Sequence, residues 1–298
     1  MTLRAKGILI ALAGTTVWAT TGIIISYLLK HYTLQPLTLA FWRDLIIACT
    51  MLLLLRVARP EALRITRRDI PFFLLYGFVG LAAFNGMWTF SVQFNGAAVA
   101  TVLAYSSPAF TVLLARPLLK EPLTLRKLAA VALSIVGCVF VARAYTAEAW
   151  RVNPVGIAVG LGTGLAFACY SLAGRWSSNR FTSPWTVTAY GFLFAATALG
   201  LTQNPDTLFT MKAWDGWAIL ILLAVGPSLV GFSLYTLSLR YLQASMASLI
   251  ATLEPALTAV MAIYLLSEQL LLWQWIGAAL ILAAVVLVQQ AEPARAAA

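Results

Sequence analysis

Long apolar blocks of about twenty residues recur through the whole chain and constrain its fold more than any other feature. An α-helix needs a stretch of that length to cross the hydrocarbon core of a bilayer. The core offers no water to unpaired backbone groups, so a crossing segment must be a helix or a strand of a closed barrel. Barrel strands alternate in polarity over about ten residues, and these blocks do not. We therefore expect an all-α integral membrane protein.

Charged or turn-rich breaks divide the chain into ten predicted spans. The division between the third and fourth rests on length, because only Phe94-Asn95-Gly96 interrupts some fifty apolar residues, too many for one span. Composition agrees, since 61% hydrophobic and 10% charged residues leave too few polar groups to cover a soluble domain. The predicted spans are 7–29, 34–55, 70–93, 97–119, 127–142, 154–174, 184–202, 216–239, 243–266 and 270–290.

The cationic residues predict the orientation of these spans. If the N-terminus is cytoplasmic, 15 of the 20 Lys and Arg residues fall on the cytoplasmic side, 4 fall outside and Arg43 lies within a span. We expect both termini in the cytoplasm and the protein in the cell (inner) membrane. The net charge of +10 is then a topology signal, and no nucleic-acid partner is needed to explain it.

Cofactor and metal chemistry are not expected. The three cysteines have no metal-ligand spacing, and His31 is the only histidine. Membrane lipid and a small-molecule substrate are the expected partners, and the sequence leaves the oligomeric state open.

An internal repeat relates the two halves of the chain, 1–150 and 151–298. Shifting the chain by 147 residues places Pro108 on Pro255 and Glu121 on Glu268, and about a third of the positions between 97 and 142 are identical. Each half holds five spans. Because five is odd, the halves cross the membrane in opposite directions. Such inverted repeats are the architecture of secondary transporters, with the substrate site near the midplane between the halves.

The repeat resembles the EamA-type repeat of the drug/metabolite transporter superfamily. Its marks here are the mid-helix prolines, the Glu121-Pro122-Leu123-Thr124 and Glu268-Gln269-Leu270 segments, and the glycines Gly137 and Gly277. The first copy departs from the second by placing Ser107 where Glu254 stands. The resemblance covers essentially the whole chain. It implies ten helices, export or exchange of amino acids and other metabolites, and no use of ATP. Within the family the chain looks most like the aromatic amino-acid exporters.

Small or polar stripes on paired spans are candidates for the transport path. Trp18 in the first span matches Phe167 in the sixth, and Tyr170 follows one turn later. Trp88 in the third span matches Tyr235 in the eighth, so the two are candidates for opposite sides of one pocket. Close helix packing and core filling are the alternative interpretations. Phe84 lies on the same stripe as Trp88, and Asn85 lies beside it.

Pro108 and Pro255 predict kinks at matching places in the fourth and ninth spans. A proline inside a helix frees the carbonyl four residues earlier, here those of Ala104 and Ala251. Interrupted helices at corresponding positions point to a binding site, although the kinks could also only fit the helices into the bundle. Polar side chains flank them and could bind a substrate, namely Tyr105, Ser106, Ser107 and Thr252.

Three charged residues lie deep within predicted spans, away from the span ends: Arg43, Asp44 and Glu254. Such groups are costly in a membrane and are functional by default. Arg43 and Asp44 are adjacent, so they should point about 100° apart and not share a face. Arg43 could bind a substrate carboxylate or pair with Glu254. Glu254 could carry a coupling proton, or it could brace the kink at Pro255.

The leading hypothesis is a secondary exporter of amino acids, aromatic or otherwise apolar, and related small metabolites. The alternatives are an exporter of another metabolite class, an integral membrane enzyme on lipid-linked substrates, and a channel. An enzyme would need a cluster of His, Asp, Glu or Cys at one membrane face, and none is seen. The expected substrate-binding residues are Trp18, Arg43, Phe84, Asn85, Trp88, Tyr105, Ser107, Phe167, Tyr170, Tyr235 and Thr252, and the expected coupling or gating residues are Glu254, Pro108 and Pro255.

Overall fold

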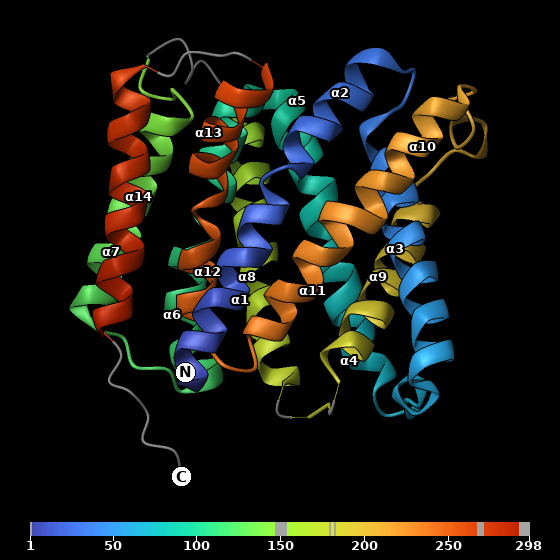
Figure 1. Cartoon of the computed structure of the whole chain (residues 1–298), viewed down its shortest axis with the longest axis horizontal. Coiled ribbons are helices and arrows are strands. Elements are labelled where there is room, and N and C mark those ends of the chain that lie inside the picture. Colours follow the sequence, from blue (N-terminus) through green and yellow to red (C-terminus); the bar gives the residue numbers. More distant parts are fainter. Residues whose placement is uncertain (1, 147–153, 179, 182, 267–270, 292–298) are drawn as a thin grey trace.

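A computed structural model describes residues 2–146, 154–178, 180–181, 183–266 and 271–291. These residues fold into a bundle of helices that run roughly parallel to one axis (Figure 1). The all-α membrane fold expected from the sequence is confirmed. The helices are α1 Leu3–Trp18, α2 Thr21–His31, α3 Pro36–Ala58, α4 Ile70–Leu74, α5 Ala83–Ala104, α6 Ser107–Leu119, α7 Leu125–Val141, α8 Pro154–Ser177, α9 Pro184–Leu201, α10 Trp214–Leu223, α11 Leu229–Ser238, α12 Ala244–Ala251, α13 Glu254–Leu266 and α14 Leu272–Ala291, with the short helices η1 Pro60–Leu63, η2 Leu75–Ala82, η4 Pro205–Thr207 and η5 Ala224–Ser228.

Ten spans can be traced through the described residues. By length and composition alone, 9 helical segments in this part of the chain are long and apolar enough to cross a membrane. The remaining span is α7, whose 17 residues lie at the short end of the range for a membrane helix. Pairs such as α1–α2 and α12–α13 act as two segments of one span.

The fourth and ninth spans are broken at equivalent positions. α5 ends at Ala104 and α6 begins at Ser107, and 147 residues later α12 ends at Ala251 and α13 begins at Glu254. Pro108 and Pro255 each occupy the second position of the new helix. A first-turn residue has no intrahelical partner for its N–H, so proline costs nothing there. The prolines therefore begin new helical segments instead of kinking continuous ones.

Three further spans, the third, the eighth and the first, were predicted as plain helices but are irregular. η2 in the third span and η5 in the eighth are π-helical, again at equivalent positions, and Gly226 in η5 has a non-helical ψ of -105°. The first span breaks between Trp18 and Thr21, whereas its counterpart α8 is continuous. The hydroxyl of Thr258 donates to the carbonyl of Ala19 at this break, 2.9 Å away. This break is thus a point where the two halves differ.

The chain reverses direction within α5, between the third and fourth spans. A Cβ placed on Gly160 of α8 would lie 2.8 Å from Ser91 Oγ and 2.7 Å from Leu103 Cβ. In a straight helix these two residues would stand about 18 Å apart. The turn between them includes the predicted break at Phe94-Asn95-Gly96.

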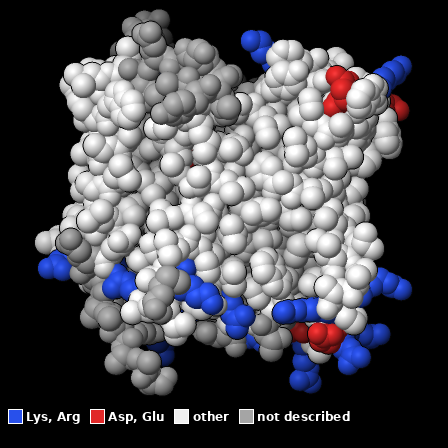
Figure 2. Space-filling view, in the orientation of Figure 1, with Lys and Arg blue, Asp and Glu red and all other residues white. Residues whose placement is uncertain are grey.

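The start of α1 and the end of α14 lie at the same side of the bundle, called here the N-terminal face, at the lower edge of Figure 1. The guanidinium of Arg4 donates to the carbonyl of Gln289 across this face. Lys and Arg side chains gather along the same edge in Figure 2, while few are visible along the opposite edge. The charge asymmetry read from the sequence is thus present on the folded surface.

Candidate functional site

A cluster of aromatic rings fills the centre of the bundle between the two halves. Trp18 is the last residue of α1, and its ring lies 4.3 Å from that of Phe232 and 5.8 Å from that of Phe167. These rings come from α1, α8 and α11 and are almost completely buried. The central cluster (Trp18, Phe84, Phe167, Tyr170, Phe232 and Tyr235) is connected by ring centroid distances of 4.3 to 5.9 Å.

The two tyrosine hydroxyls in the central cluster have hydrogen-bond partners. Tyr170 lies 2.9 Å from the hydroxyl of Thr236, and Tyr235 lies 2.7 Å from that of Ser171. A buried hydroxyl without a partner is costly, so these bonds allow polar tips within an apolar region. The cluster presents ring faces and edges, which suit an apolar or aromatic ligand.

The second element of the site is a pair formed by Tyr105 and Glu254. The Tyr105 hydroxyl donates to Glu254 Oε2 at 2.6 Å. Tyr105 lies at the break between α5 and α6, and Glu254 is the first residue of α13. The pair therefore joins the broken spans of the two halves across their interface. A carboxylate at a helix N-terminus is also stabilised by the helix dipole.

Arg43, Asp44 and Asn85 form a third, separate polar group, and the alternative that paired Arg43 with Glu254 is not what the structure shows. Arg43 curls back so that its Nε and Nη2 both lie 3.2 Å from Asp44 Oδ1, although the adjacent positions point apart on the helix. The flexible arginine side chain makes this possible. Arg43 also donates to Asn85 at 2.7 Å, and Asn85 donates to Asp44 at 2.9 Å. Arg43 thus pairs with Asp44 and not with Glu254.

The remaining candidates make no ring contact with the central cluster among the described residues. No ring contact joins Trp88 to Tyr235 in the described part of the chain, and the pocket expected between them stays a prediction. The carbonyl of Ser107 accepts from Thr111 at 2.8 Å, and the hydroxyl of Thr252 donates to Leu249 at 2.7 Å. Both act in local helix geometry at the breaks. Pro108 and Pro255 likewise begin α6 and α13.

Sequence reasoning missed two contributors to the site. Phe232 makes the shortest ring contact with Trp18, and the signal for it was present: it lies one turn before Tyr235 on the same helix face. The Thr258 bond to Ala19 had no signal in the sequence, because it joins residues 239 positions apart.

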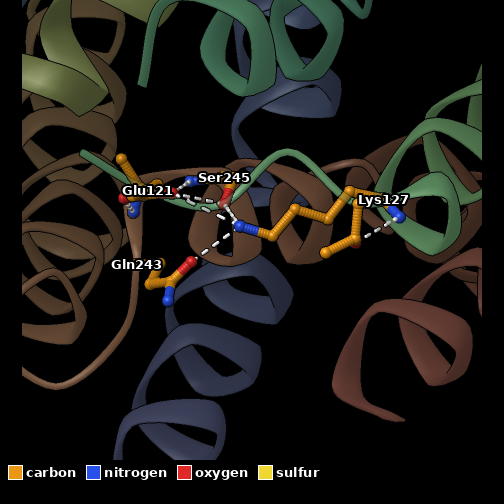
Figure 3. Close-up of polar contacts among 6 residues, drawn as sticks. Glu121, Lys127, Gln243 and Ser245 are labelled. Atoms are coloured by element: carbon orange, nitrogen blue, oxygen red, sulfur yellow. Dashed lines mark hydrogen bonds and ion pairs between the residues drawn. The ribbon is translucent and has the colours of Figure 1, made fainter. Parts of the chain in front are cut away.

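A polar cluster joins the two halves near the N-terminal face (Figure 3). Glu121 accepts from the backbone N–H of Ala244 at 2.8 Å and from the hydroxyl of Ser245 at 2.5 Å, at the beginning of α12. The ammonium of Lys127 donates to Gln243 at 2.6 Å and to Ser245 at 2.8 Å. It lies 3.6 Å from Glu121 Oε2. We call these four residues, Glu121, Lys127, Gln243 and Ser245, the latch.

The latch connects a loop of the first half to a helix start of the second. Lys127 is only 1% exposed and Glu121 8%, so both charges depend on their mutual contacts. Removing one partner of a buried charged pair leaves the other uncompensated. Glu268, which repeats Glu121 in the second half, lies outside the described residues. Gln274 stands where Lys127 would repeat, and it donates to the carbonyl of Val141 at 3.2 Å.

Comparison with protein families identifies the architecture. The sequence model of the EamA-like transporter family matches residues 5–143 and again residues 154–289. The chain belongs to the EamA-like transporter family. It is a multi-pass membrane protein and a secondary transporter, not an enzyme. The interpretation as an enzyme of lipid-linked substrates is thereby set aside.

Curated relatives agree with this assignment. An uncharacterized transporter of Archaeoglobus fulgidus is 28% identical over 70% of this chain and 74% of its own length. The uncharacterized inner membrane transporter YicL of Salmonella typhimurium is 23% identical over 95% of each chain. A probable terminal-alkyne amino-acid exporter of Streptantibioticus cattleyicolor is 27% identical over 79% of this chain and 77% of its own.

A solved structure, titled only as the crystal structure of a protein, has the same fold. Its TM-score is 0.81 at 18% sequence identity, over 97% of this chain and 98% of that one. At this identity the likeness concerns the fold alone.

Proposed function

We propose that this transporter exports aromatic or other apolar amino acids and related small metabolites by alternating access. The observation that carries the proposal is the central aromatic cluster, which lies between the halves and beside the helix breaks. An aromatic substrate can replace ring-to-ring contacts with equivalent ones, each worth about 0.5–1.5 kcal/mol beyond area burial. The relative named as a probable amino-acid exporter supports the same substrate class.

The polar ends of an amino acid also find complementary groups there. The carboxyl of Glu254 would attract the substrate ammonium, and the N-terminus of α6 would attract the substrate carboxylate. Ser107, Thr252 and Asn85 would add hydrogen bonds as the site opens. Arg43 would be released from Asp44 only at the cost of a buried charge, so it is the weaker candidate for the carboxylate.

Glu254 is the proposed coupling residue. Its hydrogen bond from Tyr105 crosses the interface of the halves, so a change of charge or partner at Glu254 would act directly on their relative position. A proton taken up on one side and released on the other would then accompany each cycle. The halves, residues 1–150 and 151–298, would rock about the site, with the breaks at Pro108 and Pro255 as hinges.

We further propose the cell (inner) membrane as the location, with both termini cytoplasmic. The inner membrane is named for YicL. The basic N-terminal face in Figure 2 supports the orientation, because cytoplasmic loops are rich in Lys and Arg.

A transport assay on purified protein in liposomes tests the substrate class. We expect uptake of labelled tryptophan, phenylalanine or leucine above the rate of empty vesicles. Trp18→Ala should raise the KM about tenfold through the lost ring contacts. Trp214→Ala is the matched control, because Trp214 is 81% exposed at the start of α10. Uptake of none of the twenty amino acids would overturn the proposal.

A further inference from the structure

A groove on the outside of the bundle lies apart from the central cluster. It has a volume of about 410 Å³ and runs between α3 and α11. This size lies within the usual range of ligand pockets. Its outward side is open, since Leu54 is 54% exposed and Val230 40% exposed. The lining residues are Met51, Leu54, Leu55, Ala58, Arg59, Trp185, Leu229, Val230, Ser233 and Leu234.

The groove has a polar end and an apolar end. Arg59 directly follows α3 at the N-terminal face, and Trp185 is the second residue of α9. The hydroxyl of Thr186 donates to the carbonyl of Ala62 at 2.7 Å. This bond joins the start of α9 to the segment that follows α3. From Arg59 the lining continues up α3 to Met51, eight residues or about 12 Å along the axis. That is most of one leaflet's hydrocarbon depth of about 15 Å.

One buried polar atom in the lining lacks a partner. Ser233 is only 5% exposed, and its hydroxyl makes no hydrogen bond within the described part of the chain. A buried hydroxyl of this kind is costly unless a partner is supplied. The ester carbonyl of a glycerolipid is an acceptor that lies below the headgroup and above the acyl chain.

The positive charge at the polar end of the groove, around Arg59, favours a lipid with an anionic headgroup. Arg59 is exposed, and the segment that follows α3 is strongly basic. Two acidic residues interrupt it, Glu61 and an Asp69 that is paired with Arg180. The exposed arginines of this segment are Arg59, Arg64, Arg67 and Arg68, and Arg56 is exposed in the last turn of α3.

We propose that this groove binds one anionic phospholipid from the leaflet at the N-terminal face. The phosphate pairs with Arg59, the ester carbonyl accepts from Ser233, and an acyl chain lies along Met51, Leu55 and Leu229. Because α3 belongs to the first half and α11 to the second, the lipid would lie between the two moving parts of the transporter.

Native mass spectrometry of the purified full chain tests the proposal. The protein in detergent is titrated with phosphatidylglycerol or phosphatidylcholine of the same acyl chains. We expect one phosphatidylglycerol to bind first and selectively. Arg59→Gln should weaken this first binding about fivefold to tenfold, as expected for one arginine near the membrane surface. Arg67→Gln is the matched control, since Arg67 is exposed but lies outside the groove.

A second variant fills the groove without removing a charge. Ala58 is an exposed lining residue, so Ala58→Trp should fold normally and abolish the selective first binding. Unchanged phosphatidylglycerol binding in both Arg59→Gln and Ala58→Trp would overturn the proposal. The same holds if Ala58→Trp keeps lipid binding but loses amino-acid transport in phosphatidylcholine vesicles, because the groove would then be an entrance for substrate.

Discussion

At the scale of single residues, the buried Tyr105–Glu254 pair is the most informative contact. The sequence singled out Glu254 as an ionisable group in a span and Tyr105 as a polar neighbour of a break, but it could not join them. They are 149 positions apart, and the bond between them is 2.6 Å long. Which buried groups meet depends on how the two halves pack, and no local pattern carries that information.

The Glu254–Tyr105 pair predicts how transport responds to a pH gradient. Glu254→Gln should bind substrate but lose the stimulation by a gradient, because an amide cannot take up and release a proton. Tyr105→Phe removes the hydrogen bond but keeps the carboxyl, so gradient-driven transport should be reduced and not abolished. Both are measured as initial uptake rates in liposomes with and without the gradient. Full gradient stimulation of Glu254→Gln would show that the coupling proton is elsewhere.

Asp69, in the loop before α4, makes a prediction about stability and pH. Hydrogen bonds from the hydroxyl and backbone of Thr66, together with Arg180, lower the pKa of Asp69 to about 2. The pKa is depressed in the folded state, so the stabilisation is complete above the ordinary value of about 3.9. It is lost as the pH falls from about 4 toward 2.

Thermal unfolding of the detergent-solubilised protein checks this. Asp69→Asn should melt below the wild type at pH 6, and the difference should shrink at pH 3. Asp206→Asn, in the exposed loop before α10, is the control and should leave the melting temperature unchanged at both pH 6 and pH 3. A constant difference between wild type and Asp69→Asn at both pH values would contradict the assigned pKa.

At the scale of elements, the sequence predicted the number and approximate bounds of the spans but not their interruptions. Apolar length is a strong signal, and it placed even the short break near Asn95. The π-helical segment of the eighth span contains Gly226 and Pro227, which were a sequence signal for it. The π-helical segment of the third span and the break after Trp18 contain no proline, and the pattern of apolar residues did not indicate them. The prolines indicated where the fourth and ninth spans change, although a new helix begins there instead of a kink.

The break between α5 and α6 depends on a close approach by α8. A Cβ on Gly164 would lie 2.3 Å from Ser106 Oγ and 3.1 Å from the carbonyl oxygens of Leu103 and Ala104. Gly164→Ala should therefore force the helices apart and cost about 1–3 kcal/mol. Gly22→Ala is the control, because a Cβ there meets nothing within 4 Å. Melting temperatures of the two variants in one detergent measure the difference; equal values would refute this packing argument.

At the scale of the whole molecule, the latch joins the two halves at the N-terminal face, and we expect it to keep this face closed. Opening this face requires Glu121 to release the start of α12 and Lys127 to release Gln243 and Ser245. The repeat singled out Glu121 in the sequence as the counterpart of Glu268. Its role as a cap on the other half became visible only in the folded protein.

Replacing Lys127 tests the latch as a conformational element. Ser248 is 1% exposed and lies between the halves, 3.3 Å from Thr111. In a background without the native cysteines, Ser248→Cys should react slowly with a membrane-impermeant thiol reagent applied from the N-terminal face. Adding Lys127→Gln should raise the rate of this thiol reaction by about tenfold, which corresponds to about 1.4 kcal/mol.

Lys120→Gln is the control for charge. It removes a positive charge from the same loop, but Lys120 is exposed. It should leave the reaction rate of Ser248→Cys unchanged. Equal rates in the Lys127 and Lys120 variants would exclude a role of the latch in closing this face.

Lys127 near the start of α7 and Gln274 near the start of α14 occupy equivalent positions of the repeat but differ in charge. This difference has a consequence for the free energy of opening each face. If the two faces do not cost the same to open, the empty carrier rests mostly with one face shut. Such a bias changes how often the site samples each compartment, and so the half-saturating concentration on each side. Detailed balance forbids this bias from choosing the direction of net flow, which the electrochemical gradients of the substrate and of the coupled proton decide. Such a carrier has different transport kinetics from its two sides, but the equilibrium distribution of its substrate is unchanged.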